Sequence, residues 1–114
     1  MARPGDVEVH VEASPEGGAT IVRVEGELDL ATCPELETAL EDADLAGRVV
    51  VDLSGCTFLD SSALRVLVRR ARAAEVSGGS TALVTTDPGI LRVLDITTTH
   101  TMLRVHDTIE SASS

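Results

Sequence analysis

The middle of the chain contains an apolar run that is followed by apolar residues at helical spacing. Residues 49–53 are mostly β-branched and apolar, which is typical of a strand covered on both faces. From Leu64 to Ala71 apolar residues recur every three or four positions. The polar face of the same stretch carries Arg65, Arg69 and Arg72. The pattern predicts a buried strand, a junction at 58–64 and an amphipathic helix.

The junction combines a helix start with two hydroxyl groups. Asp60 is suited to the N-cap position, because its carboxylate can accept the unpaired N–H groups of the first helical turn. Ser61 and Ser62 then take the first two helical positions, at the positive end of the helix dipole.

The residues before the junction predict a hairpin and a helix. Valines alternate with polar residues over 7–12, and 20–25 repeats a strand pattern after a turn rich in Gly and Pro. These two segments are expected to pair as antiparallel strands. A helix is expected over 33–44, with Thr32 and Glu35 as its capping box.

The residues after the junction predict further strands and helices. Gly78 and Gly79 are expected to end the central helix. A strand over 81–85 precedes a helix that begins at Asp87-Pro88 and ends near Ile96. The remaining expectations are a loop at 97–101, an edge strand at 103–106, a last helical turn capped by Asp107 and Glu110, and frayed ends at 1–6 and 112–114.

This element order places the chain in the α/β class. The 114 residues suffice for a single domain with one core. A hairpin followed by alternating strands and helices predicts a mixed sheet of four to five strands, with about four helices mostly on one side.

The composition excludes several kinds of site. The chain has one Phe and neither Trp nor Tyr, so it has no aromatic platform for stacking bases, and direct nucleic-acid binding is not expected. All nine basic residues are arginine, which excludes a P-loop lysine and a Schiff-base lysine.

The net charge of −10 is unevenly placed along the chain. Residues 1–44 carry twelve of the nineteen acidic residues but two of the nine arginines, and the rest of the chain is neutral. A fold that gathers the first part presents an acidic side, which repels DNA and suits a basic protein partner. The alternative is that the charge keeps a small domain soluble.

The two cysteines and the lengths of the apolar runs indicate in which cellular compartment the protein is expected. Cys33 and Cys56 form no C-x-x-C pattern and no signal peptide precedes them, which favours a cytoplasmic protein with free thiols. No apolar run approaches the roughly 20 residues of a membrane span.

The sequence offers no recognisable catalytic or metal site. No G-x-S-x-G or G-x-G-x-x-G motif is present, so no cofactor is expected. His10, His100 and His106 lack metal-ligand spacing. A Ser-His-Asp triad is not ruled out by sequence, but a lone histidine is more often a surface or core residue. The chain is therefore expected not to be an enzyme.

The hydroxyls of the junction remain as candidate chemistry. A phosphoryl group on a first-turn serine carries a charge of about −1.5 to −2, which would meet unpaired N–H groups and the positive helix end. The same charge would repel the Asp60 carboxylate and would be costly to desolvate against a partner. The alternative is that Ser61 and Ser62 are ordinary first-turn residues.

Three stretches of the chain together resemble the STAS domain, and in particular the bacterial anti-sigma-factor antagonists. They are Gly26-Glu27-Leu28-Asp29, the run 49–64 with Phe58-Leu59-Asp60-Ser61-Ser62-Ala63-Leu64, and Arg92-Val93-Leu94. The resemblance spans residues 7–112 and implies the STAS fold.

The resemblance also implies a function. Such a protein, when unphosphorylated, captures an anti-sigma factor that is itself a GHKL-type serine kinase, and so frees a sigma factor. The kinase phosphorylates the serine that maps to Ser61, and a PP2C-type phosphatase reverses this. The implied partner-binding positions are Asp29, Asp60, Ser61, Ser62, Ala63 and Leu64, in a monomer or weak dimer.

The chain departs from the family pattern at two places. Ala63 stands where the family usually has Gly, and its methyl group is expected to narrow the approach of a partner. Residues 97–101 replace the usual Thr-Gly-Leu type turn. A second hypothesis is a scaffold or transport-accessory STAS protein, stressosome-like or lipid-transport-related, whose serine is never phosphorylated. A small hydrolase using a junction serine is the third.

Overall fold

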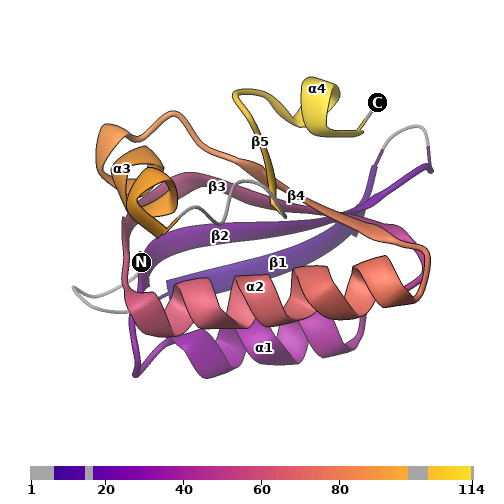
Figure 1. Ribbon diagram of the computed structural model, residues 1–114, viewed down its shortest axis with the longest axis horizontal. Coiled ribbons are helices and arrows are strands. Elements are labelled where there is room, and N and C mark those ends of the chain that lie inside the picture. Colours follow the sequence, from indigo (N-terminus) through magenta and orange to yellow (C-terminus); the bar gives the residue numbers. More distant parts are fainter. Residues whose placement is uncertain (1–6, 15–16, 98–102, 114) are drawn as a thin grey trace.

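The computed structural model describes residues 7–14, 17–97 and 103–113 (Figure 1). In chain order the elements are β1 (Val7–Ala13), β2 (Thr20–Leu28), α1 (Cys33–Glu41), β3 (Arg48–Leu59), α2 (Ser61–Val76), β4 (Ser80–Val84), α3 (Pro88–Thr97), β5 (Arg104–His106) and α4 (Ile109–Ser113). The predicted order of strands and helices is confirmed.

The strands form one mixed sheet in the order β1-β2-β3-β4-β5. β1 and β2 are antiparallel, as the predicted hairpin requires, and the other neighbouring pairs are parallel. Because β2 to β5 run in the same direction, their carboxyl ends lie at the same edge of the sheet. This edge positions the loops and helix starts that follow the strands.

The helices divide unequally between the two faces of the sheet. One face carries the main core, in which side chains of α1, α2 and α3 pack on alternate residues of the strands, such as Val49, Val51 and Leu53. The opposite face carries a smaller core of Ile21, Val50 and neighbours, which α4 covers. Three of the four helices in the described part of the chain thus lie on one side, as predicted.

β3 is much longer than the sequence indicated. The apolar run predicted a strand at 49–53, but pairing with β2 continues from Thr20↔Val49 to Leu28↔Leu59. The parallel ladder passes Ser54 and Gly55 with two shifts of register, and at each shift β3 contains one more residue than β2. A contact between residues about 30 positions apart holds this extension, so local sequence could not reveal it.

Two predicted helix caps are wrong. The Thr32 side chain does not cap α1; its hydroxyl donates to the Glu27 carbonyl oxygen at 2.7 Å and accepts the Asp29 N–H. α1 also ends at Glu41 rather than at residue 44. In α4 the Thr108 hydroxyl, not Asp107, accepts a first-turn N–H, that of Ser111.

Other predicted helix boundaries are confirmed. Asp87 caps α3 by accepting the N–H groups of Gly89 and Ile90. α2 ends at Val76, and Gly78 follows with a φ of 86°. Gly79 lies so close to the backbone of 45–47 that a Cβ atom would contact the Leu45 carbonyl oxygen at 2.1 Å. The glycine pair therefore both ends the helix and lets β4 start against this turn.

The last part of the chain differs from expectation at its end. α4 continues to Ser113 and buries Ala112, so 112–113 are helical where fraying was expected. The predicted edge strand at 103–106 is present as β5. Of the loop expected at 97–101, Thr97 is the last residue of α3, and 98–101 lie outside the described residues.

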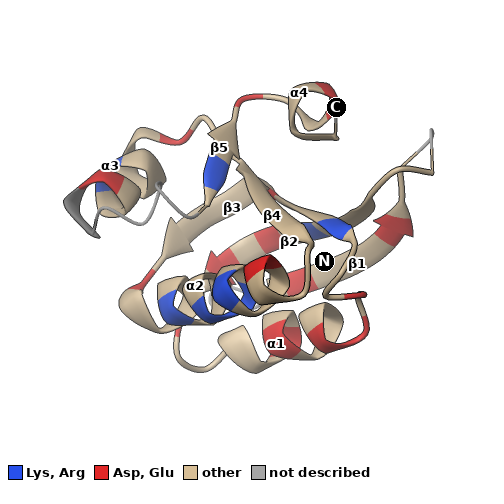
Figure 2. Cartoon of the chain, turned by 45° about the vertical axis from the view of Figure 1, so that its right-hand side comes forward, with Lys and Arg blue, Asp and Glu red and all other residues tan. Residues whose placement is uncertain are grey.

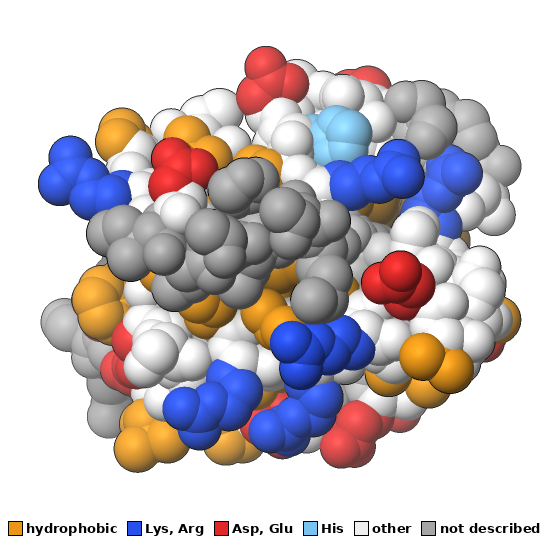
Figure 3. Space-filling view, viewed as in Figure 1, with side chains coloured by type: hydrophobic (Ala, Val, Ile, Leu, Met, Phe, Trp, Pro, Cys, Tyr) orange, Lys and Arg blue, Asp and Glu red, His pale blue; other side chains and the backbone are white. Residues whose placement is uncertain are grey.

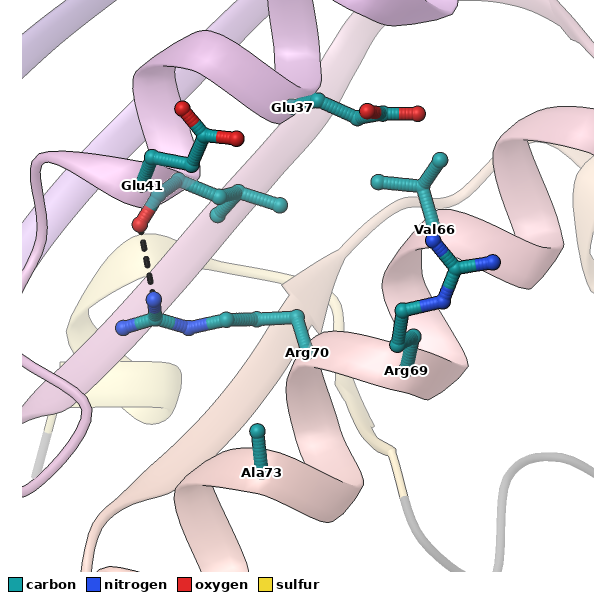
Figure 4. Close-up of a pocket in the computed structure, with 7 residues that line it drawn as sticks. Glu37, Glu41, Val66, Arg69, Arg70 and Ala73 are labelled. Atoms are coloured by element: carbon teal, nitrogen blue, oxygen red, sulfur yellow. Dashed lines mark hydrogen bonds between the residues drawn. The ribbon is translucent and has the colours of Figure 1, made fainter.

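A buried arginine joins the two helices of the main face. Arg70 of α2 is 9% exposed, and its guanidinium donates to the carbonyl oxygens of Leu40, Ala43 and Asp44 at 2.7, 3.2 and 3.1 Å. Figure 4 shows the Arg70 side chain reaching from α2 to the end of α1. Carbonyl groups at the end of α1 and just after it thus receive a cationic donor.

Charge is distributed as the sequence suggested. β1, β2 and α1, which come from the acidic first part, lie next to one another, and acidic residues recur along them (Figure 2). Arginine side chains gather instead over α2 (Figure 3). Arg65, Arg69 and Arg72 are all exposed there, and they are called the α2 arginine row below.

Candidate functional site

The predicted site residues lie where β2 and β3 end side by side. Leu28 pairs with Leu59, the last residues of the two strands, and the Asp60 N–H donates to the Leu28 carbonyl oxygen at 3.1 Å. The chain then continues from β2 into the loop at 29–32 and from β3 into α2. Asp29 and Asp60, which are 31 residues apart in sequence, are therefore the next residues after neighbouring strand ends.

Asp60 caps α2 as predicted. Its backbone is extended, and its carboxylate accepts the N–H groups of Ser62 at 2.9 Å and Ala63 at 3.1 Å. Ser61 is the first helical residue and is exposed, whereas Ser62 is half-buried. The Ser61 hydroxyl is thus accessible on the rigid start of a 16-residue helix.

The loop after β2 is held by its own hydrogen bonds. The Asp29 carboxylate accepts the N–H groups of Ala31 and Thr32, each at 3.0 Å, and the Asp29 N–H donates to the Thr32 hydroxyl at 2.9 Å. Because Thr32 also binds the Glu27 carbonyl oxygen, the loop is fixed to the end of β2. A fixed loop presents a shaped surface to a partner at little entropic cost.

Two of the predicted partner-binding residues lie beneath this surface. Ala63 is 0% exposed and Leu64 is 5% exposed, and both belong to the main core. Their side chains therefore support the helix start and do not form contact surface. The expectation that the Ala63 methyl group narrows the approach of a partner is wrong, because this methyl group faces the core.

Two exposed apolar side chains flank the site and were not singled out from the sequence. Leu30 is 74% exposed in the loop after β2, and Phe58 is 48% exposed near the end of β3. The signal was available for Phe58, since an aromatic residue directly before the junction in so aromatic-poor a chain is unusual. Exposed apolar side chains next to a hydrophilic group are typical of a protein-binding surface.

The helix start has little capacity left for an added anion. The N–H groups of Ser62 and Ala63 already donate to Asp60, and those of Ala31 and Thr32 donate to Asp29. A phosphoryl group on Ser61 would meet a helix end that one carboxylate already occupies. The expectation that such a group meets unpaired N–H groups is therefore corrected at these two helix positions.

The buried thiols near the site are poor nucleophiles. Burial raises the pKa of the Cys33 thiol, and the carboxylates of Glu37, Asp60 and Asp29 raise it further. Burial likewise raises the pKa of the Cys56 thiol, which donates to the Phe58 carbonyl oxygen at 3.1 Å. Both thiols are therefore protonated at neutral pH, which does not suit nucleophilic catalysis.

Metal clusters, membrane spans and grooves are the other features of the described part of the chain that bear on function. Within 7–14, 17–97 and 103–113, no three His, Cys, Asp or Glu residues gather as metal ligands, and no helix is long and apolar enough to cross a membrane. A groove between α1 and α2 is lined by Glu37, Leu40, Glu41, Val66, Arg69, Arg70 and Ala73 (Figure 4). These lining residues include none of the candidate site residues.

The capping of α2 by Asp60 leads to a testable prediction. Asp60→Ala removes the cap and should lower the free energy of unfolding by about 1 kcal/mol, because two first-turn N–H groups lose their acceptor. Asp60→Asn is the matched control, since Asn caps equally well and should change stability by less than about 0.5 kcal/mol. Urea unfolding followed by circular dichroism measures both. Equal destabilisation by the two variants would contradict the capping role.

Comparison with known proteins identifies a family model and several relatives. The model of the STAS domain matches residues 10–112. An anti-sigma F factor antagonist from Paenibacillus polymyxa is 27% identical over 104 residues, which cover 89% of this chain and 89% of that protein.

Solved structures share the fold. An anti-sigma factor antagonist from Mycobacterium paratuberculosis superposes with a TM-score of 0.84 at 27% identity, over 98% of this chain and 95% of that one. The Bacillus cell fate determinant SpoIIAA, solved in a phosphorylated form, gives a TM-score of 0.69 at 21% identity, over 92% of this chain and 96% of that one. The second likeness is one of fold alone.

Proposed function

The chain belongs to the STAS domain family, and from this premise we propose that it is an anti-sigma factor antagonist controlled by phosphorylation of Ser61. In the unphosphorylated form it binds an anti-sigma factor in the cytoplasm and so releases a sigma factor. The observation that carries the proposal is the exposed Ser61, the first residue of α2, which directly follows the capping carboxylate of Asp60.

The surface around Ser61 fits a basic partner with apolar contacts. Asp29 and Asp60 supply two carboxylates, and Leu30 and Phe58 supply exposed apolar area. Apolar side chains supply the burial that drives association, and the charges set the orientation and the choice of partner. We therefore propose that Asp29, Leu30, Phe58, Asp60, Ser61 and Ser62 form the docking surface, with Ala63 and Leu64 as its support.

Phosphorylation would convert this surface from attractive to repulsive. The Ser61 oxygen forms a bond to the γ-phosphorus of ATP, the bond from that phosphorus to the β,γ-bridging oxygen breaks, and ADP leaves. The serine proton passes to a base of the kinase, which we propose is the GHKL-type anti-sigma factor itself. The product carries about two negative charges next to Asp60. A PP2C-type phosphatase would restore the hydroxyl by hydrolysis.

The choice between the two serines is directly testable. Incubation with the cognate kinase and ATP, followed by mass-spectrometric site mapping, should place one phosphate on Ser61, because Ser61 is exposed and Ser62 is half-buried. Ser61→Ala should reduce incorporation at least about 20-fold, whereas the matched Ser62→Ala variant should retain most of it. Mapping to Ser62, or unchanged incorporation in Ser61→Ala, would overturn the assignment.

A further inference from the structure

The exposed face of α2 places an arginine one helical turn after the proposed phosphorylation site. Ser61 and Arg65 are four residues apart in the same helix, and both are exposed. Residues at this spacing are neighbours on a helix surface. A helical side chain also lies over the turn that precedes its own Cα atom, which directs Arg65 towards Ser61.

Among the described residues, Arg65 takes part in no ion pair with a carboxylate. The first-turn N–H groups of Ser62 and Ala63 are occupied by Asp60, so they do not compete for a phosphoryl group on Ser61. Arg69 lies eight residues from Ser61, about 12 Å along the helix axis, and is too distant. Arg65 is therefore the member of the α2 arginine row that can reach the group.

We propose that Arg65 binds the phosphoryl group of phosphorylated Ser61 through a pairing within α2, and so makes the phosphorylated form a distinct, self-stabilised state. A guanidinium presents two parallel N–H donors that match two phosphate oxygens. The opposing charges at the site are the carboxylates of Asp60 and Asp29, both already engaged with backbone N–H groups. Phosphorylation would thus add negative charge and also withdraw an exposed arginine from any partner.

This inference rests on Ser61 as the modified residue, but its test needs no kinase or partner. Phosphoserine is inserted at position 61 during translation, and the unfolding equilibrium constant is measured for proteins with Ser61 or phosphoserine and with Arg65 or Gln. Arg65→Gln should destabilise the phosphorylated protein about fivefold and the unphosphorylated protein less than twofold. Arg65→Lys should keep part of this extra stabilisation of the phosphorylated protein, because lysine keeps the positive charge but lacks the two parallel N–H donors of the guanidinium.

Arg72→Gln is the matched control, since Arg72 is exposed in the same helix but lies about 16 Å from Ser61 along the helix axis. This change should destabilise the phosphorylated and unphosphorylated proteins equally. The 31P resonance of phosphoserine 61 should shift with Arg65→Gln and not with Arg72→Gln. Equal effects of Arg65→Gln with and without the phosphate, with an unmoved 31P resonance, would overturn the inference.

The two proposals fail separately. If no coupling between phosphoserine 61 and Arg65 is measured, the proposed control of partner binding by phosphorylation still stands. If phosphoserine 61 and Arg65 are coupled but the partner binds the phosphorylated and unphosphorylated proteins equally well, the Arg65 pairing is supported and the proposed function is overturned.

Discussion

Phosphoserine at position 61 is expected to weaken binding of the cognate anti-sigma factor roughly 30- to 1000-fold, a loss of about 2–4 kcal/mol. Ser61 is exposed at the strand ends that also carry Asp29, Asp60, Leu30 and Phe58, so a partner docked there would have to cover the added dianion. The first-turn N–H groups that would compensate this charge already bind Asp60. Isothermal titration of the unphosphorylated and phosphorylated proteins with the partner measures the loss.

Single substitutions separate charge from the loss of the hydroxyl. Ser61→Ala should bind within about threefold of wild type, and Ser61→Asp should lose about tenfold, because it carries one charge on a shorter side chain. Ser80→Asp is the matched control, since Ser80 is exposed at the start of β4, on the opposite edge of the sheet. Affinity that is the same for phosphoserine 61, Ser61→Ala and Ser61→Asp would remove the proposed switch.

Ionic strength gives an independent measure of the same effect. An exposed charge is screened by salt, whereas the apolar contacts of Leu30 and Phe58 are not. The loss of partner affinity caused by phosphoserine 61 should therefore be smaller at 500 mM salt than at 50 mM salt. A loss that does not vary with salt would point to steric bulk instead of charge.

Local patterns were sufficient to predict the elements that position the site. The alternation over 7–12, the apolar run at 49–53 and the helical spacing after Leu64 each gave the right element, because side-chain period follows directly from backbone geometry. Asp60 and Asp87 gave the right helix starts for a similar reason, since a cap binds N–H groups two and three residues away.

Features that depend on contacts distant in sequence were not predicted. The extension of β3 to Leu59 requires pairing with β2. The Thr32 hydroxyl is a local exception: it binds the Asp29 N–H and the Glu27 carbonyl oxygen, three and five residues before it, and does not cap α1. The burial of Ala63 could have been read from the sequence, because this residue lies four positions before Leu67 on the apolar stripe. The resemblance to a family motif predicted a contiguous set of partner-binding residues at 60–64. Consecutive residues of a helix point in different directions, so some of this set face the core and others face solvent.

The contacts of Arg70 are a further example of a feature that local sequence does not predict. It lies three residues after Leu67, on the buried side of α2, where the helical pattern calls for an apolar residue. Its acceptors are Leu40, Ala43 and Asp44, which precede it by 26 to 30 residues. The sequence could mark the position as unusual, whereas the partners could be known only from the fold.

Arg70→Ala is expected to lower the free energy of unfolding by about 3 kcal/mol. A hydrogen bond from a charged donor contributes roughly 1.5–3 kcal/mol, but the three bonds do not simply add. The carbonyl oxygens of Leu40 and Asp44 keep backbone partners, the N–H groups of Ala43 and Gly47. Urea unfolding by far-ultraviolet circular dichroism suits this chain, which has no Trp or Tyr. Arg69→Ala, an exposed neighbour, should change stability by less than about 0.5 kcal/mol.

Arg70→Leu separates the hydrogen bonds from the packing of the side chain. Burial lowers the pKa of the Arg70 guanidinium, while the Asp44 carboxylate partly offsets this, so holding the cation between α1 and α2 carries a desolvation cost. Leucine removes that cost and fills much of the space, and the loss should therefore fall to about 2 kcal/mol. A loss as large as that of Arg70→Ala would show that the bonds to α1 dominate. If Arg70→Ala costs no more than Arg69→Ala, the proposed tie between the helices is wrong.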